Sequence, residues 1–501
     1  MEAREEVNGL DYFLNGSAVS KVRILRFLEA QSQSVSLTQI AEVCGIEKRT
    51  AKKNVHELAM ELETLTDQAK IVRSEKTKGY WLERSFAFSV KTIERLYNQN
   101  SLPYQFLDTV FKGQFVNSVK FSNEAYVSYG SLYRSLKRLV PLLNTFDLDI
   151  QLKREPIIHG DEKQIRYFYY LFYWDSNWAE EWPFDVISLK QAESLLDKAF
   201  GRCQESLLYW VGVNVSRIRK GFTIARDRFF DVFVKTHPLF EQFRKDIYTL
   251  YKELTKINDR DLEDEIAFLF LAFISFSYLE KGDQRSISFI QNAFSNASAD
   301  FVKYTIQWLD RFIDFFGVAI SGEEYTTLYA NLINIHLADS YFKGNSFFFS
   351  NDHSETEPDQ LVDSFLDHLT TQVVWLDKNR KRELLDRYRF LLRNVLGFDG
   401  AVKPIKIKLY SIFGEAGKNI GLKMVQEVYP HLRFCEPGEA PDLIVSDRDY
   451  VTLKKEKANG AVVCILNVNN PAKQDYLRLE NCIRVILKKN EAQPTVSNVI
   501  H

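Results

Sequence analysis

Apolar positions in the first sixty residues recur at helical spacing in three consecutive segments. Residues 21–28 predict one helix and residues 37–43 a second. Cys44-Gly45-Ile46 interrupts the pattern, and helical spacing resumes at Ala51, Val55 and Leu58. Because Gly45 provides the backbone freedom that a tight turn requires, the pattern predicts a helix-turn-helix unit.

The polar face of the third helix is strongly basic. It carries Lys48, Arg49, Thr50, Lys52 and Lys53 opposite the apolar positions. The second helix of such a unit lies in the major groove of DNA, where side chains meet phosphates and base edges. A basic run can also be a plain solvated helix face. The turn before it and the hairpin after it favour DNA contact.

A hairpin is predicted directly after this helix. Residues 69–82 have apolar ends around Lys76-Thr77-Lys78-Gly79, so the tip carries Lys76 and Lys78 toward the DNA backbone as the wing of a winged helix. Residues 20–84 contain twelve Lys or Arg and nine Asp or Glu, whereas the whole chain has a net charge of −2. The DNA-binding surface is therefore expected to be local.

The same arrangement recurs further along the chain. Residues 121–126 predict a short helix, Ser128 an N-cap, and residues 131–140 a second helix. Its inward positions are Leu132, Leu136 and Leu139, and the residues expected to contact DNA are Tyr129, Tyr133, Arg134, Lys137 and Arg138. Residues 119–154 carry six basic and three acidic side chains, which favours a second DNA-contacting unit.

Helices dominate the pattern after this second unit. A short hairpin over residues 148–158 closes it, with His159 in a structural role, and the aromatic segment 164–174 predicts a packed core helix rather than a base-stacking platform. Residues 186–394 have few turn breakers and predict an all-helical middle. Its most apolar stretch, residues 266–278, is shorter than the ~20 residues that span a bilayer, so we expect a buried helix.

The rhythm changes near the end of the chain. Buried strands are predicted at residues 405–413 and 461–466, with shorter ones at 432–436 and 443–446, and helical patterns separate them. The last part is therefore expected to be a small α/β domain. The fold class is mainly α and multidomain, since 501 residues exceed what one hydrophobic core organises.

Composition adds two exclusions. The five cysteines are odd in number, far apart and without a CxxC pair, and the N-terminus has no secretory pattern, so we expect a cytoplasmic protein that does not associate with membranes. The chain has no HExxH, GxSxG or GxGxxG motif, and Gly414 to Lys418 lack the spacing of a phosphate-binding P-loop. No catalytic residue, cofactor or metal site is expected.

In this order of elements the chain resembles the Mga and AtxA family of Gram-positive global (virulence) transcriptional regulators. The most telling residues run from Ser131 to Trp174 and through the tryptophan-rich segment 177–184. The resemblance implies two helical bundles related to PTS-regulation domains, those of the sugar phosphotransferase system, and a terminal domain similar to its EIIB component. The implied ranges are 1–88 for the winged helix-turn-helix domain, 89–178 for the second (Mga-type) helix-turn-helix domain, 179–285 and 286–398 for the two PTS-regulation-like bundles, and 403–492 for the EIIB-like domain.

Histidines of PTS-regulation domains can be phosphorylated, and the resemblance directs attention to four positions. Phe222 stands where the best-matching relatives place a histidine, and nearby His237 precedes Pro238, for which we expect a structural or solvent-exposed role. His336 is the candidate phosphoacceptor, with His368 one helix later. A lone helical histidine is more often an ordinary packing or capping residue.

The resemblance also suggests a role for the terminal domain. An active EIIB domain has a reactive cysteine after its first strand, but residues 413–418 contain none. Phosphoryl transfer by this domain is therefore not expected, and the family's example implies self-association.

We therefore expect a transcriptional activator that binds double-stranded promoter DNA as a homodimer or larger oligomer, with phosphotransferase-system proteins as further partners. Lysines outnumber residues that bind base edges in a bidentate manner, so DNA curvature or groove shape can guide site choice. Two alternatives stay open. One is an RNA-binding antiterminator with PTS-regulation domains, against which the winged-helix N-terminus argues. The other is a phosphotransferase-system component.

Overall fold

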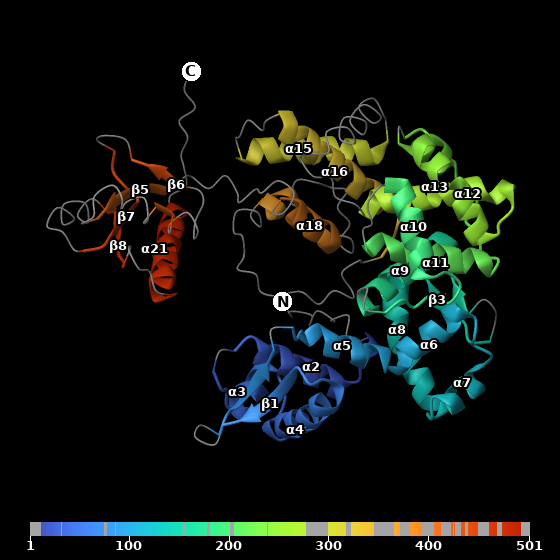
Figure 1. Cartoon of the computed structure of the whole chain (residues 1–501), viewed down its shortest axis with the longest axis horizontal. Coiled ribbons are helices and arrows are strands. Elements are labelled where there is room, and N and C mark those ends of the chain that lie inside the picture. Colours follow the sequence, from blue (N-terminus) through green and yellow to red (C-terminus); the bar gives the residue numbers. More distant parts are fainter. Residues whose placement is uncertain are drawn as a thin grey trace. The chain divides into compact units, whose positions relative to one another are not determined.

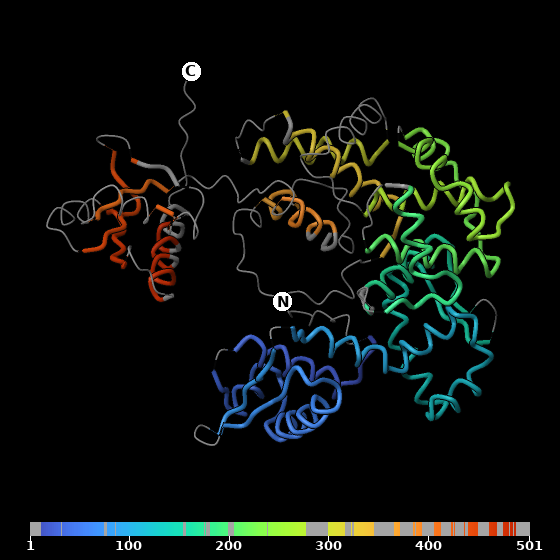
Figure 2. The backbone as a smooth tube through the Cα atoms, viewed as in Figure 1, coloured from blue at the N-terminus to red at the C-terminus, as the bar shows by residue number. Residues whose placement is uncertain are grey.

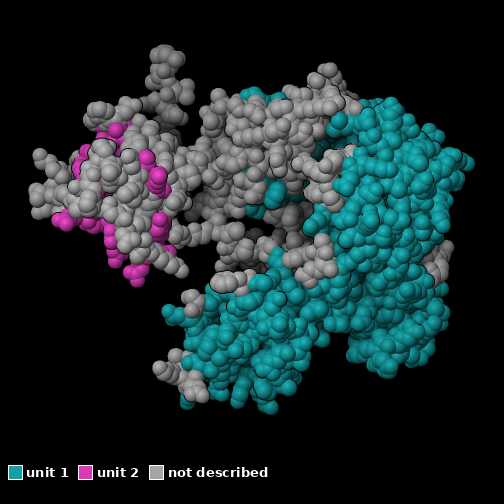
Figure 3. Space-filling model, in the orientation of Figure 1, with its two compact units in different colours: residues 1–398 teal, residues 399–501 magenta. Residues whose placement is uncertain are grey.

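The computed structural model of the chain divides into two compact units, residues 1–398 and 399–501 (Figure 3). Helices dominate the first unit, and the second contains a four-stranded sheet (Figure 1). The structure describes residues 12–31, 33–74, 78–85, 87–153, 157–177, 181–200, 205–237, 239–276, 299–316, 322–344, 365–370, 381–392, 405–411, 422–423, 425, 432–435, 439–448, 460–467 and 473–491.

The predicted winged helix-turn-helix elements are observed at the N-terminal end, drawn in blue in Figure 2. They are α2 (Gly16–Glu29), α3 (Leu37–Val43), α4 (Lys48–Leu65), β1 (Ala69–Arg73) and β2 (Tyr80–Arg84). The two strands form an antiparallel hairpin, and Val35 forms a β-bridge with Tyr80 beside it. A shared core includes Leu25 of α2, Ile40 of α3 and Leu58 of α4, all fully buried.

Local capping explains why α3 begins where it does. The Ser36 hydroxyl accepts from the Gln39 amide at 3.2 Å, and the Gln39 side chain accepts from the Ser36 amide at 2.8 Å. This reciprocal capping box satisfies two backbone donors that the first turn leaves without helical partners. The helix ends at the turn through Gly45, whose φ of +63° is the left-handed conformation that glycine adopts at little cost.

The second helix-turn-helix unit follows a pair of packed helices. Its elements are α5 (Val90–Gln99), α6 (Leu102–Lys112), α7 (Ser118–Glu124), α8 (Tyr129–Thr145), β3 (Asp149–Ile150) and β4 (Ile158–His159). Ser128 is the N-cap of α8, as predicted, and its hydroxyl accepts from the Ser131 amide at 3.1 Å. The paired β3 and β4 confirm the predicted hairpin.

The predicted ends of α7 and α8 were wrong by several residues. Helix α7 begins at Ser118 rather than residue 121, and α8 continues past Pro141 to Thr145 instead of ending at residue 140. Pro141 lies on the exposed side of α8, where water can satisfy the carbonyl that loses its amide partner. Leu142 and Leu143 beyond it are fully buried, and their burial favours continuing the helix.

The middle of the chain is helical throughout its described residues. Its elements are α9 (Glu162–Asn177), α10 (Leu189–Phe200), α11 (Glu205–Arg219), the π-helical turn η1 (Phe230–Val234), α12 (Phe240–Thr255), α13 (Asp259–Phe276), α15 (Asp300–Phe316), α16 (Gly322–Tyr341) and α18 (Lys381–Phe390). The aromatic residues of α9, among them Tyr167 and Phe168, are buried, which confirms a packed core helix. Within the described ranges, no helix has the length and apolarity to cross a membrane.

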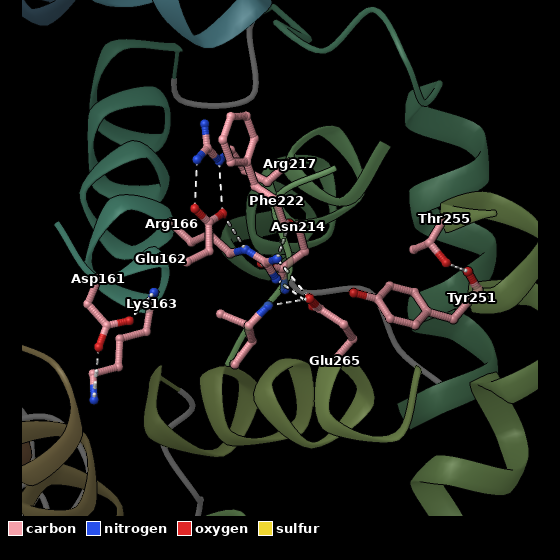
Figure 4. Close-up of polar contacts among 11 residues, drawn as sticks. Asp161, Glu162, Lys163, Arg166, Asn214, Arg217, Phe222, Tyr251, Thr255 and Glu265 are labelled. Atoms are coloured by element: carbon pink, nitrogen blue, oxygen red, sulfur yellow. Dashed lines mark hydrogen bonds and ion pairs between the residues drawn. The ribbon is translucent and has the colours of Figure 1, made fainter. Parts of the chain in front are cut away.

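A buried ion network joins α9 to α11 and α13 (Figure 4). Arg166 and Glu265 are both fully buried, and they form a bidentate pair with N–O distances of 2.6 and 2.9 Å. On its other side Arg166 donates through Nε to Glu162 at 3.0 Å. Glu162 also accepts two hydrogen bonds from Arg217, at 2.8 and 2.6 Å. Burial alone would raise the pKa of Glu162, but the hydrogen bond from Arg217 and the charge of Arg166 bring it below its ordinary value.

The same network fixes the chain segment that follows α11. The Phe222 carbonyl accepts from Arg166 at 3.0 Å, and the Ile224 amide donates to Glu265 at 2.7 Å. The guanidinium of Arg217 lies 3.9 Å from the centre of the Phe222 ring, a cation–π contact. Phe222 thus packs on this network at the position where the resemblance led us to look for a histidine.

The second compact unit, residues 399–501, contains the small α/β domain that the sequence predicts. Its sheet consists of parallel strands in the order β6 (Leu432–Phe434), β5 (Ile405–Tyr410), β7 (Leu443–Ser446) and β8 (Val462–Ile465), followed by α21 (Lys473–Glu491). The loop at residues 413–418, where an EIIB cysteine would lie, is outside the described residues.

Removing the carboxylate of Glu265 should strongly destabilise the compact unit 1–398. Glu265→Ala leaves Arg166 charged and buried, and breaking such a pair costs about 3–5 kcal/mol of unfolding free energy. Lys303→Ala is the control, because it removes an exposed pair with Asp300 and should cost under about 1 kcal/mol. Urea unfolding followed by circular dichroism measures both. Similar small losses in the two variants would contradict a structural role for the network.

Candidate nucleic-acid interface

The basic residues predicted on the recognition helix of the first helix-turn-helix unit all lie on one exposed face of α4. Lys48, Arg49, Thr50, Lys52 and Lys53 are exposed, whereas Ala51, Val55, Leu58 and Leu62 are buried on the opposite face. Lys53 lies 3.7 Å from Glu57, and the ion pairs found among the described residues do not include Lys48, Arg49 or Lys52. This face therefore presents positive charge to solvent.

The structure describes one of the two lysines predicted at the tip of the hairpin. Lys78 is exposed and has a left-handed backbone with φ of +53°, while Lys76 lies outside the described residues. The Ser74 amide donates to the Gly79 carbonyl at 2.8 Å, which closes the hairpin. A Cβ at Gly79 would lie 2.9 Å from the Val35 carbonyl oxygen, so the close approach of the wing to the domain requires glycine there.

The second helix-turn-helix unit presents four of its five predicted DNA-contacting residues together. Tyr129, Tyr133, Arg134 and Lys137 are exposed on α8, opposite the buried leucines of that helix. Arg138 is exposed as well, but its guanidinium donates to the Leu14 carbonyl at 3.0 Å. Arg138 thus has a partner within the protein that the sequence pattern did not predict.

The two units share one turn geometry. Each has a seven-residue first helix and the same number of residues between its helices. The Ile46 amide donates to Ala41 at 3.0 Å in the first turn, and the Val127 amide donates to Ser122 at 2.9 Å in the second. Tyr126, with φ of +54°, takes the place of Gly45.

Tyr126 was missed in the sequence analysis. It is 96% exposed, next to the exposed residues of α8. The signal that identifies it is the constant offset of 81 residues between the two units, which aligns it with Gly45.

The candidate phosphoacceptor His336 is enclosed. Its Nδ1 lies 2.7 Å from the Thr305 hydroxyl and its Nε2 lies 2.6 Å from the Tyr388 hydroxyl. The ring is therefore held between α15, α16 and α18, and burial lowers the pKa of His336 to about 3. In this conformation neither ring nitrogen faces solvent.

The other histidines named from the sequence have different surroundings. His237 is buried against Phe270, as expected for a structural role, and burial lowers its pKa to about 4. His368 lies with its ring 5.3 Å from that of Phe315. Where residues are described, no group of three or more His, Cys, Asp or Glu side chains is arranged to hold a metal ion.

Acid should weaken the helical middle through His336. The unfolded ring binds a proton near pH 6.5 and the folded ring only near pH 3, so stability is fully present above 6.5 and declines as the pH falls. Between pH 6.5 and 5 the loss is about 2 kcal/mol for this one group. We expect His336→Gln to reduce that slope in urea unfolding measured across the range. Parallel slopes for His336→Gln and wild type would contradict the assignment.

Comparison with known proteins identifies a family domain that covers the second helix-turn-helix unit. The model of the Mga helix-turn-helix domain matches residues 86–173, which include α5 to α8 and most of α9. A protein of Streptococcus pneumoniae serotype 4, whose name is that of a trans-acting regulator, is 20% identical over 181 residues.

That alignment covers 36% of this chain and 35% of the relative, so the chain spans about a third of the length of the curated protein it matches. Both findings agree with the resemblance drawn from the sequence. Residues 86–173 thus match an Mga helix-turn-helix domain, and both findings support the similarity of this chain to Mga-like regulators.

Proposed function

We propose that this protein is a transcriptional regulator that binds double-stranded promoter DNA through its two helix-turn-helix units. The observation that carries the proposal is the pair of helices α4 and α8. Each follows a helix-turn-helix turn, buries one apolar face and exposes cationic side chains on the other. The matched Mga helix-turn-helix domain and the name of the Streptococcus relative support the same function.

Most of the contacts are proposed to go to phosphates. The residues proposed to make them are Arg49, Lys52 and Lys53 of α4, Lys76 and Lys78 of the wing, and Arg134, Lys137 and Arg138 of α8. Lys48 and Thr50 of α4 and Tyr129 and Tyr133 of α8 complete the proposed DNA-binding surface. Lysine and arginine neutralise phosphate charge and release counterions, so affinity should fall steeply with salt. Arg138 would have to release the Leu14 carbonyl before it could contact DNA.

Activation, self-association and control by phosphorylation are further parts of the proposal. A homodimer or larger assembly would place several basic helices on one DNA face. Phosphotransferase-system proteins are the proposed source of a phosphoryl group for His336. Because that ring lies between α15, α16 and α18, phosphorylation requires these helices to separate, and the added charge would keep them apart. The four parallel strands of the compact unit 399–501 suit an EIIB-like domain, for which we propose a role in self-association.

Charge reversal on α4 tests DNA binding. Arg49→Glu/Lys53→Glu should lower affinity for promoter duplex at least tenfold without unfolding the protein, because both side chains are exposed. Fluorescence anisotropy at several salt concentrations measures the affinity, and wild type should lose roughly 10³–10⁵ between 50 and 200 mM salt if it neutralises six to ten phosphates. Lys303→Glu, on the exposed face of α15, is the matched control.

The same titrations separate the alternatives. Unchanged affinity in the double variant, or a flat salt response, would exclude this interface. Preferential binding to leader RNA would favour an antiterminator instead. Transfer of phosphate from the purified protein to a sugar or carrier would favour a phosphotransferase component.

Regulation by phosphorylation is tested with radiolabelled phosphate. The general phosphotransferase proteins should label wild type, whereas His336→Ala should lose the label and His368→Ala should keep it. Acid lability of the label identifies phosphohistidine, since a phosphate on nitrogen hydrolyses in acid. Absence of label from wild type, or its persistence in His336→Ala, would remove His336 from the mechanism and leave DNA binding unaffected.

A further inference from the structure

The turn of the second unit holds an exposed aromatic residue in an unfavourable backbone conformation. Tyr126 has φ of +54°, in the left-handed region where a bulky residue costs of order 1 kcal/mol or more. The first unit has glycine at the equivalent position, Gly45, with φ of +63°. Since the Tyr126 side chain is 96% exposed, packing within the chain does not account for its presence.

Two more exposed tyrosines continue this surface along α8. Tyr129 is 50% exposed and Tyr133 is 54% exposed. They lie four residues apart, so both side chains are on one helix face, and Tyr126 precedes that face by less than one turn. Exposed aromatic side chains gathered on one face mark a binding surface. We call Tyr126, Tyr129 and Tyr133 the tyrosine face.

The equivalent positions of the first unit carry lysine. With the offset of 81 residues, Tyr129 corresponds to Lys48 and Tyr133 to Lys52, and both pairs are exposed on their helices. One turn geometry thus presents flexible cations in one unit and rigid, largely apolar rings in the other. The two units differ in the chemistry of what they can contact.

The surroundings of the tyrosine face indicate a polyanion as its partner. Arg134 and Lys137 are exposed beside it on α8, and the nearby carboxylate of Glu124 is 3.8 Å from Lys120. The first turn of α8 contains no acidic residue, so its helix dipole adds positive potential at that end. A protein surface of net positive charge would be repelled here, whereas DNA brings phosphates to the cations and base edges to the rings.

We propose that the tyrosine face supplies sequence preference to this regulator by packing against the C5-methyl groups of thymine in the major groove. The inference rests on the proposed function, DNA binding. Apolar side-chain contact with the thymine methyl is an established form of base recognition, and a tyrosine ring offers a rigid apolar edge for it. The lysines at the equivalent positions of the first unit contribute affinity without base preference.

The test removes the methyl groups from the DNA and the rings from the protein. The full chain is used to select duplexes from a random-sequence library, and the most enriched duplex is synthesised with thymine and again with uracil. Wild type should bind the uracil duplex about fourfold more weakly for each methyl contacted, the equivalent of ~0.8 kcal/mol per buried carbon. Fluorescence anisotropy gives the ratio of the two affinities.

Matched variants assign that ratio to the tyrosine face. Tyr129→Ala/Tyr133→Ala should bring the ratio near one, while Tyr129→Phe/Tyr133→Phe, which keeps the rings, should preserve it. Lys48→Ala/Lys52→Ala at the equivalent positions should weaken binding to both duplexes and leave the ratio as in wild type. Tyr126→Gly should lower the ratio and raise the melting temperature, because glycine relieves the left-handed conformation.

The outcomes that overturn the proposal are distinct. Salt-dependent binding with a ratio of one in wild type, or with an unchanged ratio in Tyr129→Ala/Tyr133→Ala, removes the thymine contact and leaves the DNA-binding function standing. Loss of the ratio in the phenylalanine variant would show that packing of the apolar rings alone does not recognise the methyl groups, and would overturn the proposed contact. Failure of wild type to bind any duplex overturns the proposed function together with this inference.

Discussion

Arg166 and Glu265 meet where water reaches neither of them, and the arrangement of the first unit around α9 depends on that contact. Each charge would be costly alone, because an ion in a protein interior loses its hydration. The bidentate geometry, with Glu162, Asn214 and the Phe222 carbonyl as further partners, satisfies the Arg166 guanidinium fully. Ions in such a network have few alternative positions, so the pair fixes which faces of α9, α11 and α13 meet.

The position of this network in the chain matters for how the protein works. Helix α9 completes the matched Mga helix-turn-helix domain at residue 173, and the same helix contributes its polar side to the network and its aromatic side to the core of the helical middle. In the described chain, α9 therefore belongs both to the second helix-turn-helix unit and to the helical middle, with no separate linker between them. A rearrangement of α11 against α13 would therefore act directly on α9, because Arg166 of α9 pairs with Glu265 of α13 and Glu162 of α9 pairs with Arg217 of α11.

Much of this architecture could be predicted from the sequence, for physical reasons that also explain the failures. Helical spacing of apolar residues located α3 and α4 because both helices bury one face against a local core. The end of α8 was misplaced because the cost of Pro141 was weighed without the burial of Leu142 and Leu143, which depends on distant contacts. The ion network was not foreseen at all, since Arg166 and Glu265 are 99 residues apart and neither lies in a motif. The basic residues of α4 were the most accessible to prediction, because a cation exposed on a helix needs no partner from elsewhere in the chain.

The enclosure of His336 has a kinetic consequence. A reagent or enzyme that must reach its ring nitrogens finds them only in molecules whose three surrounding helices have parted, since Thr305 and Tyr388 occupy both nitrogens otherwise. The rate of any chemistry at this ring is then reduced by the small fraction of molecules in which the bundle is open. The packing of α15, α16 and α18 therefore sets the rate of modification at His336 as well as the stability of this part of the chain.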